Sequence, residues 1–246
     1  MVDWLMTPID ISREHSIGVM ISWHARLMIL AWGVIVPTGV FITRYLKILP
    51  GQNWPLELDN QLWWRCHWMS QSFAIILSVL GIGLIIGSAG DGPAFFLHVV
   101  PGYCVLALGV FQITLGIIRG SKGGPTDPAP DGSLRGDHYD MTRRRLVFEA
   151  LHRVFGYLAL AIAMATILTG MWIVNAPVWM WFAIVAYWAA LICAALYLQH
   201  EGRAFDTYQA IWGADPELPG NRLPRQGWWT TRPAETLNFN YEKEKE

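Results

Sequence analysis

Charged side chains are scarce in this sequence. Lysine, arginine, aspartate and glutamate make up 15% of its 246 residues, whereas hydrophobic residues make up 53% and the mean hydropathy is +0.31. A soluble domain ordinarily carries about 25% charged residues. The composition therefore excludes an ordinary soluble protein and predicts an integral membrane protein. The formal net charge of -1 gives no indication of binding to nucleic acid.

Cysteine is equally rare, and so are signals for secretion. Cys66, Cys104 and Cys193 all fall inside apolar runs and share no CxxC spacing, so neither a disulfide framework nor a zinc site is expected. The opening residues, MVDWLMTPIDIS, have no basic segment followed by a long apolar one. We therefore expect no cleavable signal peptide.

What the sequence has in quantity is long apolar runs. One of them, residues 22–45, is uncharged between Arg26 and Arg44 and is long enough to cross the bilayer as a helix. Pro37 and Gly39 lie deep inside it, where a kink is tolerated because neighbouring helices can bond the freed backbone groups. Four more such runs follow, so we predict an all-α integral membrane protein with five transmembrane helices. These helices are expected at about 17–45, 61–87, 94–118, 146–173 and 177–199.

The polar remainder divides the chain into three parts. Residues 1–16 form a short lead, 17–199 the transmembrane domain, and 200–246 a polar tail expected on the membrane surface or against a partner. Five spans put the two termini on opposite sides of the membrane. Of the 18 lysines and arginines, 16 fall on the side of the tail and only Arg13 and Arg26 on the other. The positive-inside rule therefore predicts an outer N-terminus and a cytoplasmic tail.

The histidines follow a pattern. Four of the seven fall one each on the first four predicted helices, about five to seven residues after each helix begins. Because successive helices run in opposite directions, His24 and His98 lie near the outer side, and His67 and His152 near the cytoplasmic side. A single transmembrane histidine ordinarily makes an interhelical hydrogen bond. Four histidines at matched depths indicate ligands instead.

Two pairs of histidines, one at each depth, are the arrangement needed to hold two bis-imidazole haems stacked along the membrane normal. The rise of the helices would put the two irons about 15–20 Å apart. This separation disfavours one metal site made from all four histidines. We therefore expect the first four helices to form a haem-binding four-helix bundle and the fifth helix to be peripheral. The remaining alternative is a haem-free transporter or scaffold that uses the histidines to handle protons or metals.

The third and fourth predicted helices repeat one pattern. HVVPGYCVLALGVFQITLG begins at His98 and HRVFGYLALAIAMATILTG begins at His152, and each has glycine four residues later, tyrosine five later, a small residue eleven later and glycine eighteen later. Spacings of 4, 11 and 18 stay on one face of a helix. This face would leave a groove for a flat macrocycle, or else only allow two helices to pack tightly.

Cations near the histidines are candidate partners of haem propionates. Arg26, Arg65 and Arg153 each lie within two residues of one of the four histidines. The triplet Arg143–Arg145 is expected to bind lipid headgroups or an anionic reductant, with lipid favoured. The remaining histidines are expected to be ordinary exposed or interfacial residues. They are His15, His138 and His200, of which the last two would replace the cytoplasmic pair if that assignment were wrong.

The stretch HARLMILAWGVIVPTGVFITRY resembles the opening helix of the cytochrome b561 core in DOMON-linked proteins, with the pattern H-x-x-L-M-x-x-A-W-G-x-x-x-P-x-G-x-x-x-x-R-Y. His67 in CHWMSQ, His98 in FFLHVVPGY and His152 in EALHRVFGY stand where the family's other three histidines stand, in the same order. The resemblance covers about 17–199, and its first motif is the most specific.

The resemblance implies two haem b groups, held by His24 with His98 and by His67 with His152. It implies an electron-transfer cytochrome rather than a bond-making enzyme, fed by a quinol- or ascorbate-like donor and passing electrons to an acceptor on the other side or to a partner protein. Compared with the family, this sequence has a longer loop and a tail, and we expect it to act without a DOMON domain. These departures favour a one-piece protein of a bacterial inner membrane, or a haem-bearing anchor subunit whose partners dock on 119–145 and 200–246.

Overall fold

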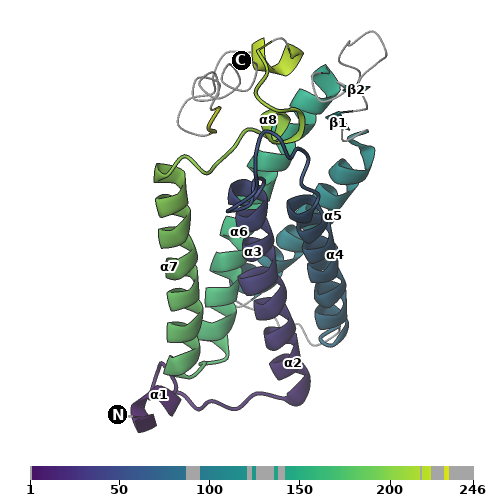
Figure 1. The fold of residues 1–246 in the computed structure, drawn as a ribbon. Coiled ribbons are helices and arrows are strands. Elements are labelled where there is room, and N and C mark those ends of the chain that lie inside the picture. The colour runs from purple at the N-terminus through teal and green to yellow at the C-terminus, as the bar shows by residue number, and fades with distance from the viewer. Residues whose placement is uncertain are drawn as a thin grey trace. The chain divides into compact units, whose positions relative to one another are not determined.

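The computed structural model describes residues 2–86, 95–120, 124–125, 136–137, 142–216, 218–222 and 230–232. This part of the chain is almost entirely helical (Figure 1), and it contains five helices that are long and apolar enough to cross a membrane. The spans are Val19–Tyr45, Leu62–Gly83, Phe96–Ile118, Arg143–Ile173 and Val178–His200. The prediction of an all-α integral membrane protein with five transmembrane helices is confirmed.

The first and third of the five spans contain π-helical turns. The first span consists of α2 (Val19–Met28), the π-helix η1 (Ile29–Ile35) and α3 (Val36–Tyr45). The second is α4 (Leu62–Gly83), and the third begins as the π-helix η2 (Phe95–Val99) and continues as α5 (Val100–Ile118). The fourth and fifth are α6 (Arg143–Ile173) and α7 (Val178–His200). The short elements are α1 (Val2–Met6), α8 (Thr207–Trp212), the 3-10 helix η4 (Pro219–Arg222) and the antiparallel strands β1 (Gly124–Pro125) and β2 (Gly136–Asp137).

The chain forms two compact units. The first contains Met1–Val40, Trp68–Ile117 and Ala150–Cys193, and the second contains Phe41–His67, Ile118–Glu149 and Ala194–Glu246. The long helices pass from one unit to the other. Each unit has its own buried apolar cluster.

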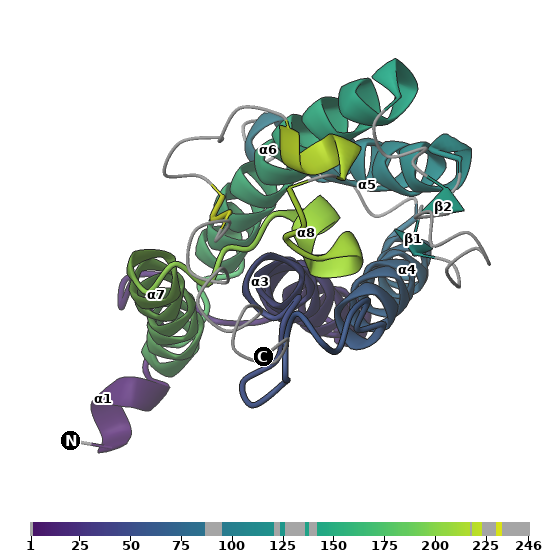
Figure 2. The same cartoon turned by 45° about the horizontal axis from the view of Figure 1, so that its top comes forward.

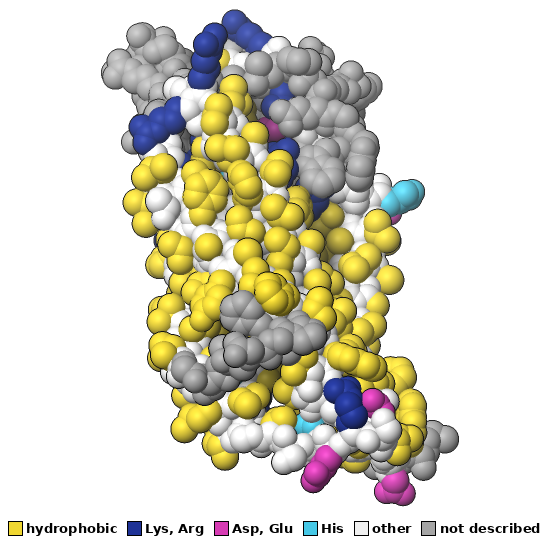
Figure 3. Space-filling model, turned by 180° about the vertical axis from the view of Figure 1, so that it is seen from behind, with side chains coloured by type: hydrophobic (Ala, Val, Ile, Leu, Met, Phe, Trp, Pro, Cys, Tyr) yellow, Lys and Arg dark blue, Asp and Glu magenta, His cyan; other side chains and the backbone are white. Residues whose placement is uncertain are grey.

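The core of the first unit is built from small residues and tryptophans. Ala31, Ala74 and Trp32 are buried there, and the Trp32 indole donates to Ser78 Oγ over 2.8 Å. Helix α7 contributes one edge, with Trp188 buried. Hydrophobic side chains cover the outer face of the helices (Figure 3), as expected where the surrounding medium is lipid.

The π-helical turn in the first span exposes carbonyl groups, and α7 bonds them. Pro37 has no N–H, so the carbonyl of Gly33, four residues earlier, lacks its usual helical partner. The Trp188 indole donates to this carbonyl over 2.9 Å, and the Tyr187 hydroxyl donates to the carbonyl of Val34 over 3.3 Å. Neighbouring side chains thus complete the backbone around this proline, as the sequence led us to expect.

The lead before the first span is fixed to the turn between α6 and α7. Asn175, which is 1% exposed and has a φ of 51°, donates through Nδ2 to the carbonyls of Asp10 and Arg13. Its Oδ1 accepts from the Asp10 amide over 3.0 Å. The Arg13 guanidinium also lies over the Trp172 ring, 4.9 Å from its centre. One asparagine therefore holds a segment more than 160 residues away in sequence.

The second unit buries part of the C-terminal segment. Trp63, Tyr208, Ile211 and Trp212 form its apolar cluster, in which α8 and η4 lie beside each other (Figure 2). The Asp206 side chain caps the start of α8 by accepting hydrogen bonds from the backbone amides of Tyr208 and Gln209.

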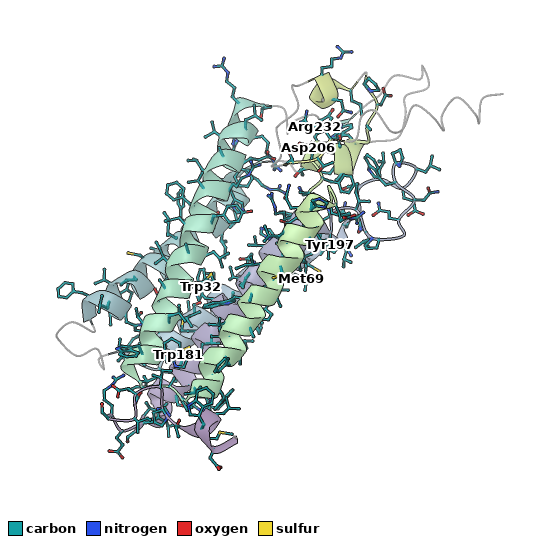
Figure 4. The ribbon with its side chains drawn as sticks, turned by 90° about the vertical axis from the view of Figure 1, so that its left-hand side faces the viewer. Trp32, Met69, Trp181, Tyr197, Asp206 and Arg232 are labelled. Atoms are coloured by element: carbon teal, nitrogen blue, oxygen red, sulfur yellow. The ribbon has the colours of Figure 1, made fainter. Side chains whose placement is uncertain are left out.

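Two segments of the tail are joined by an ion pair and an isolated β-bridge in the same unit. Arg232 Nη2 lies 3.2 Å from Asp206 Oδ2 (Figure 4), and Thr231 pairs with Phe205. Lys47, which follows the first span, donates through Nζ to the carbonyl of Phe205 over 2.8 Å. Many of the described residues of 200–246 are therefore packed within this unit. The expectation that the tail lies on the membrane surface or against a partner stays a prediction.

We expect Asn175→Ala to destabilise the first unit and to release the lead. The change leaves the Asp10 amide and two carbonyls without partners at a buried position, at a cost of about 2–4 kcal/mol. The measurement is thermal melting in detergent together with the rate of tryptic cleavage at Arg13. Asn175→Gly is the control: it tolerates the positive φ but also loses the hydrogen bonds, so it should be destabilised too. A wild-type melting temperature in Asn175→Gly would show that the side-chain hydrogen bonds contribute nothing.

Candidate functional site

The structure brings together two of the four transmembrane histidines. His24, on α2, and His98, on η2, both belong to the first unit, and their ring centres lie 6.2 Å apart with an interplanar angle of 83°. Both side chains are half-buried. The predicted proximity of these two residues at one depth is therefore observed.

Both imidazoles are oriented by a backbone carbonyl of a facing helix. His24 Nδ1 lies 3.0 Å from the carbonyl oxygen of Gly81, on α4, and His98 Nδ1 lies 3.0 Å from that of Thr166, on α6. A carbonyl only accepts, so in each neutral ring the proton is on Nδ1 and the lone pair is on Nε2. Metal-binding histidines in proteins commonly make this hydrogen bond with the ring nitrogen that does not bind the metal.

The distance between the rings fits a metal ion between them. An imidazole nitrogen binds a first-row metal at about 2 Å, and the ring centre lies roughly 1 Å behind it, so two axial imidazoles have centres about 6 Å apart. The observed 6.2 Å agrees with this sum. Among the described residues, no three His, Cys, Asp or Glu side chains are grouped as metal ligands. Two histidines are what an iron needs when a macrocycle supplies its other ligands.

The glycines of the repeated pattern leave room for specific neighbours. A Cβ at Gly170 would lie 2.7 Å from Cε1 and 3.0 Å from Nδ1 of His98, so only glycine admits this ring. A Cβ at Gly109 would lie 2.9 Å from the Trp32 indole. Gly116, the counterpart of Gly170 on α5, has no atom within 4 Å of such a Cβ. The repeated spacing thus admits an aromatic ring beside Gly170 and Gly109 and leaves open space beside Gly116.

The other two histidines lie in different units. His152, on α6 in the first unit, is half-buried, and Gly156 follows it by one turn near the Gln112 amide. Both polar atoms of the Gln112 side chain are buried without a hydrogen-bond partner among the described residues. In the second unit, the His67 ring lies 6.4 Å from that of Trp64. The pairing of His67 with His152 stays a prediction.

The distance along α6 between the level of His152 and the level of His98 can be counted in residues. His152 and Thr166, whose carbonyl oxygen lies against His98, are fourteen residues apart on this helix. At 1.5 Å per residue, this corresponds to about 21 Å of helix. On α4, fourteen residues likewise separate His67 from Gly81, the acceptor for His24. Each of the two helices thus carries one histidine and, fourteen residues later, a carbonyl that accepts from a histidine of another helix.

The arginines expected beside the histidines are all exposed. The Arg26 guanidinium lies over the Trp23 ring, 5.2 Å from its centre. Residues two apart on a helix point to nearly opposite sides, which carries Arg26 away from His24 and Arg65 away from His67. Arg153 follows His152 directly and is also exposed. Their role towards a cofactor stays a prediction.

Two buried arginines lie near His67 instead, in the second unit. Arg119 is 8% exposed, and its guanidinium lies over the Trp64 ring, 4.2 Å from its centre. Arg145 is 4% exposed and bonds Glu149 through Nε over 3.0 Å, while its Nη1 is buried without a hydrogen-bond partner among the described residues. Burial, and then the charge of Arg145, lower the pKa of Arg119 to about 10, against an opposing effect of Glu149.

Sequence reasoning missed this pair because basic residues at the ends of spans ordinarily reach the headgroups. The weak signal was the spacing of Trp64 and His67, which share a helical face at three residues apart. Of the other histidines, His15 Nδ1 lies 2.8 Å from the carbonyl oxygen of Val174, and the His200 side chain is 88% exposed. His138, with most of the loop 121–141, lies outside the described residues.

Comparison with known proteins adds distant relatives. No family model matches the chain, and no solved structure matches it. It is 23% identical over 167 residues to a cytochrome b561, DM13 and DOMON domain-containing protein of Arabidopsis thaliana, a match that covers 68% of this chain and 16% of that protein. It is 27% identical over 176 residues to a cytochrome b561 and DOMON domain-containing protein of the same plant, covering 71% and 32%.

A shorter match joins the chain to an animal protein. Over 67 residues it is 31% identical to a protein of Mus musculus named transmembrane reductase, covering 27% of this chain and 28% of that protein. The chain thus spans between a sixth and a third of the length of these relatives. It is a distant relative of proteins named cytochrome b561.

Proposed function

We propose that this chain transfers electrons across a membrane through b-type haem, and that His24 and His98 are the axial ligands of one haem. The single observation that carries the proposal is the pair of imidazole rings, whose centres lie 6.2 Å apart. In each ring Nδ1–H donates to a backbone carbonyl, so Nε2 has a free lone pair. The relatives named cytochrome b561 and transmembrane reductase support it.

A second haem would be held by His67 and His152. The support is the fourteen-residue separation on both α4 and α6, which repeats the construction of the first site at a second depth. The buried Gln112 amide beside Gly156, which has no hydrogen-bond partner within the described ranges of the chain, adds a polar group that suits a bound cofactor in the same region of α5 and α6.

Haem iron supplies a one-electron couple when it is bound. The chain's own residues do the rest. The carbonyls of Gly81 and Thr166 fix the imidazole tautomers, and Gly170 leaves space for the His98 ring. With His24 and His98 both holding the iron, the site would supply electron transfer rather than bond-making chemistry.

The donor is proposed to be a quinol or an ascorbate-like reductant, and the acceptor a molecule on the other side or a redox partner. The excess of basic residues on the side of the tail supports a cytoplasmic C-terminus and an outer N-terminus. The segments 119–145 and 200–246 are the proposed docking surfaces for a partner. The membrane lipids would contact the exposed arginines of the triplet Arg143–Arg145.

For the propionates of the second haem, we favour buried Arg119 and Arg145 over exposed Arg65 and Arg153. Among the described residues, the two buried cations face the carboxylate of Glu149, and one N–H group of Arg145 has no acceptor there. A carboxylate near Trp64 would satisfy that group and neutralise the excess charge. Arg26 is kept as the candidate for the first haem.

The purified protein should bind two b-type haems per chain. We expect His24→Ala and His98→Ala each to remove the same haem, and His67→Ala and His152→Ala each to remove the other, because each pair shares one iron. Reduced-minus-oxidised spectra and a pyridine haemochrome assay per chain measure this. His200→Ala is the control and should keep both haems. Loss of both haems in folded His24→Ala would contradict the pairing.

The Gly170→Ala change should disturb the first haem without touching either ligand. Its methyl group would come within about 3 Å of the His98 ring, a distance that forces the ring to move. We expect reduced occupancy or an altered low-spin signal of the haem that His98→Ala removes. Gly116→Ala is the matched control, with open space around the added carbon. Equal haem signals in the two variants would show that the close approach is unimportant.

Arg145→Met should lower the midpoint potential of the haem that His67→Ala removes. Loss of a buried positive charge beside Glu149 favours the oxidised, more positive iron, and each tenfold change in the ratio of reduced to oxidised haem is about 59 mV. We expect a shift of about that size in a redox titration. Arg143→Met, at an exposed position on the same helix end, should leave the potential unchanged. An unshifted potential in Arg145→Met would place this arginine away from the haem.

A further inference from the structure

The two carbonyls that orient the histidines are not equivalent. The carbonyl of Thr166 lies inside α6, which continues to Ile173, so the helix directs the Gly170 amide toward it. It also lies 3.0 Å from His98 Nδ1 and accepts from the Thr169 hydroxyl over 3.0 Å. Three donors therefore compete for one oxygen with two lone pairs.

The carbonyl of Gly81 has less competition. Helix α4 ends at Gly83, and the amide of Ile85, which would bond Gly81 in a continuing helix, instead bonds the carbonyl of Ile82 over 3.0 Å. Gly81 thus carries one of the carbonyls at a helix end, at the negative end of the helix dipole. Among the residues that the structure describes, His24 is the side chain that bonds this carbonyl.

The strength of such a hydrogen bond affects an iron on the far side of the ring. A stronger bond from Nδ1–H makes the imidazole a better electron donor through Nε2, which stabilises oxidised iron. A second donor to the same carbonyl weakens the bond from the ring. The Thr169 hydroxyl therefore acts on the His98 ring through the backbone, without contact with the iron.

We infer that Thr169 raises the reduction potential of the haem held by His24 and His98, because its hydroxyl shares the Thr166 carbonyl with His98. The inference rests on the proposed function. A threonine bond to a carbonyl three residues earlier is common in membrane helices. Here the acceptor is the one that orients a ligand, and this gives the hydroxyl a second consequence.

The test is a redox titration of Thr169→Val, which keeps the shape of the side chain and removes the donor. The midpoint potential of the haem that His98→Ala removes should fall, with about a threefold change in the ratio of reduced to oxidised haem, or about 30 mV at 59 mV per tenfold. The other haem should keep its potential. Thr169→Ser retains the hydroxyl and should restore the wild-type value.

Thr166→Val is the matched control. It removes a hydroxyl of the same size from the same helix, one that donates to the carbonyl of Ile162 over 2.8 Å, and it keeps the backbone carbonyl that faces His98. Its potential should not move. Equal shifts in the two valine variants, or no shift in Thr169→Val, would overturn the inference alone. A chain whose haem content is unchanged in His98→Ala would overturn the proposed function, and with it the inference.

Discussion

The hydrogen bond from a histidine ring to the backbone carbonyl of a facing helix is the interaction on which the site depends. A neutral imidazole in a membrane needs a partner for its N–H, and side chains that could serve are scarce in spans so apolar. The chain uses carbonyls instead. Gly81 and Thr166 each fix one ring, and in doing so they turn both Nε2 atoms into available ligands.

Backbone groups serve as partners throughout the first unit. The carbonyls freed around Pro37 bond Trp188 and Tyr187, and the turn at Asn175 bonds the lead. Each of these contacts joins segments that are more than 150 residues apart in sequence. Apolar packing alone is a weak determinant of register between helices in lipid, so such bonds define where one helix meets another.

The sequence predicted the spans and the meeting of His24 with His98 because both follow from simple geometry. Hydropathy sets where a helix crosses, and alternation of direction sets the depth of each residue. What the sequence could not predict depends on tertiary neighbours. The burial of Arg119 and Arg145 needs the second unit to fold over them, and Asp206 caps a helix too short to be recognised from its pattern. Arg26, chosen by proximity in sequence, lies over the Trp23 ring, because two residues make more than half a turn and put it on another side of the helix than His24. Its role towards a cofactor stays a prediction.

The repeated pattern of the third and fourth helices resolves into a difference between them. The ring of His98 occupies the space beside Gly170, whereas the counterpart Gly116 borders open space. Equal sequence spacing therefore gives unequal surroundings. The acceptors differ in the same way, since one lies within a helix and the other at a helix end. In the proposed haem site both acceptors would serve one iron. Two histidines of the same kind would then differ in donor strength because of their neighbours, without any change in the ligands themselves.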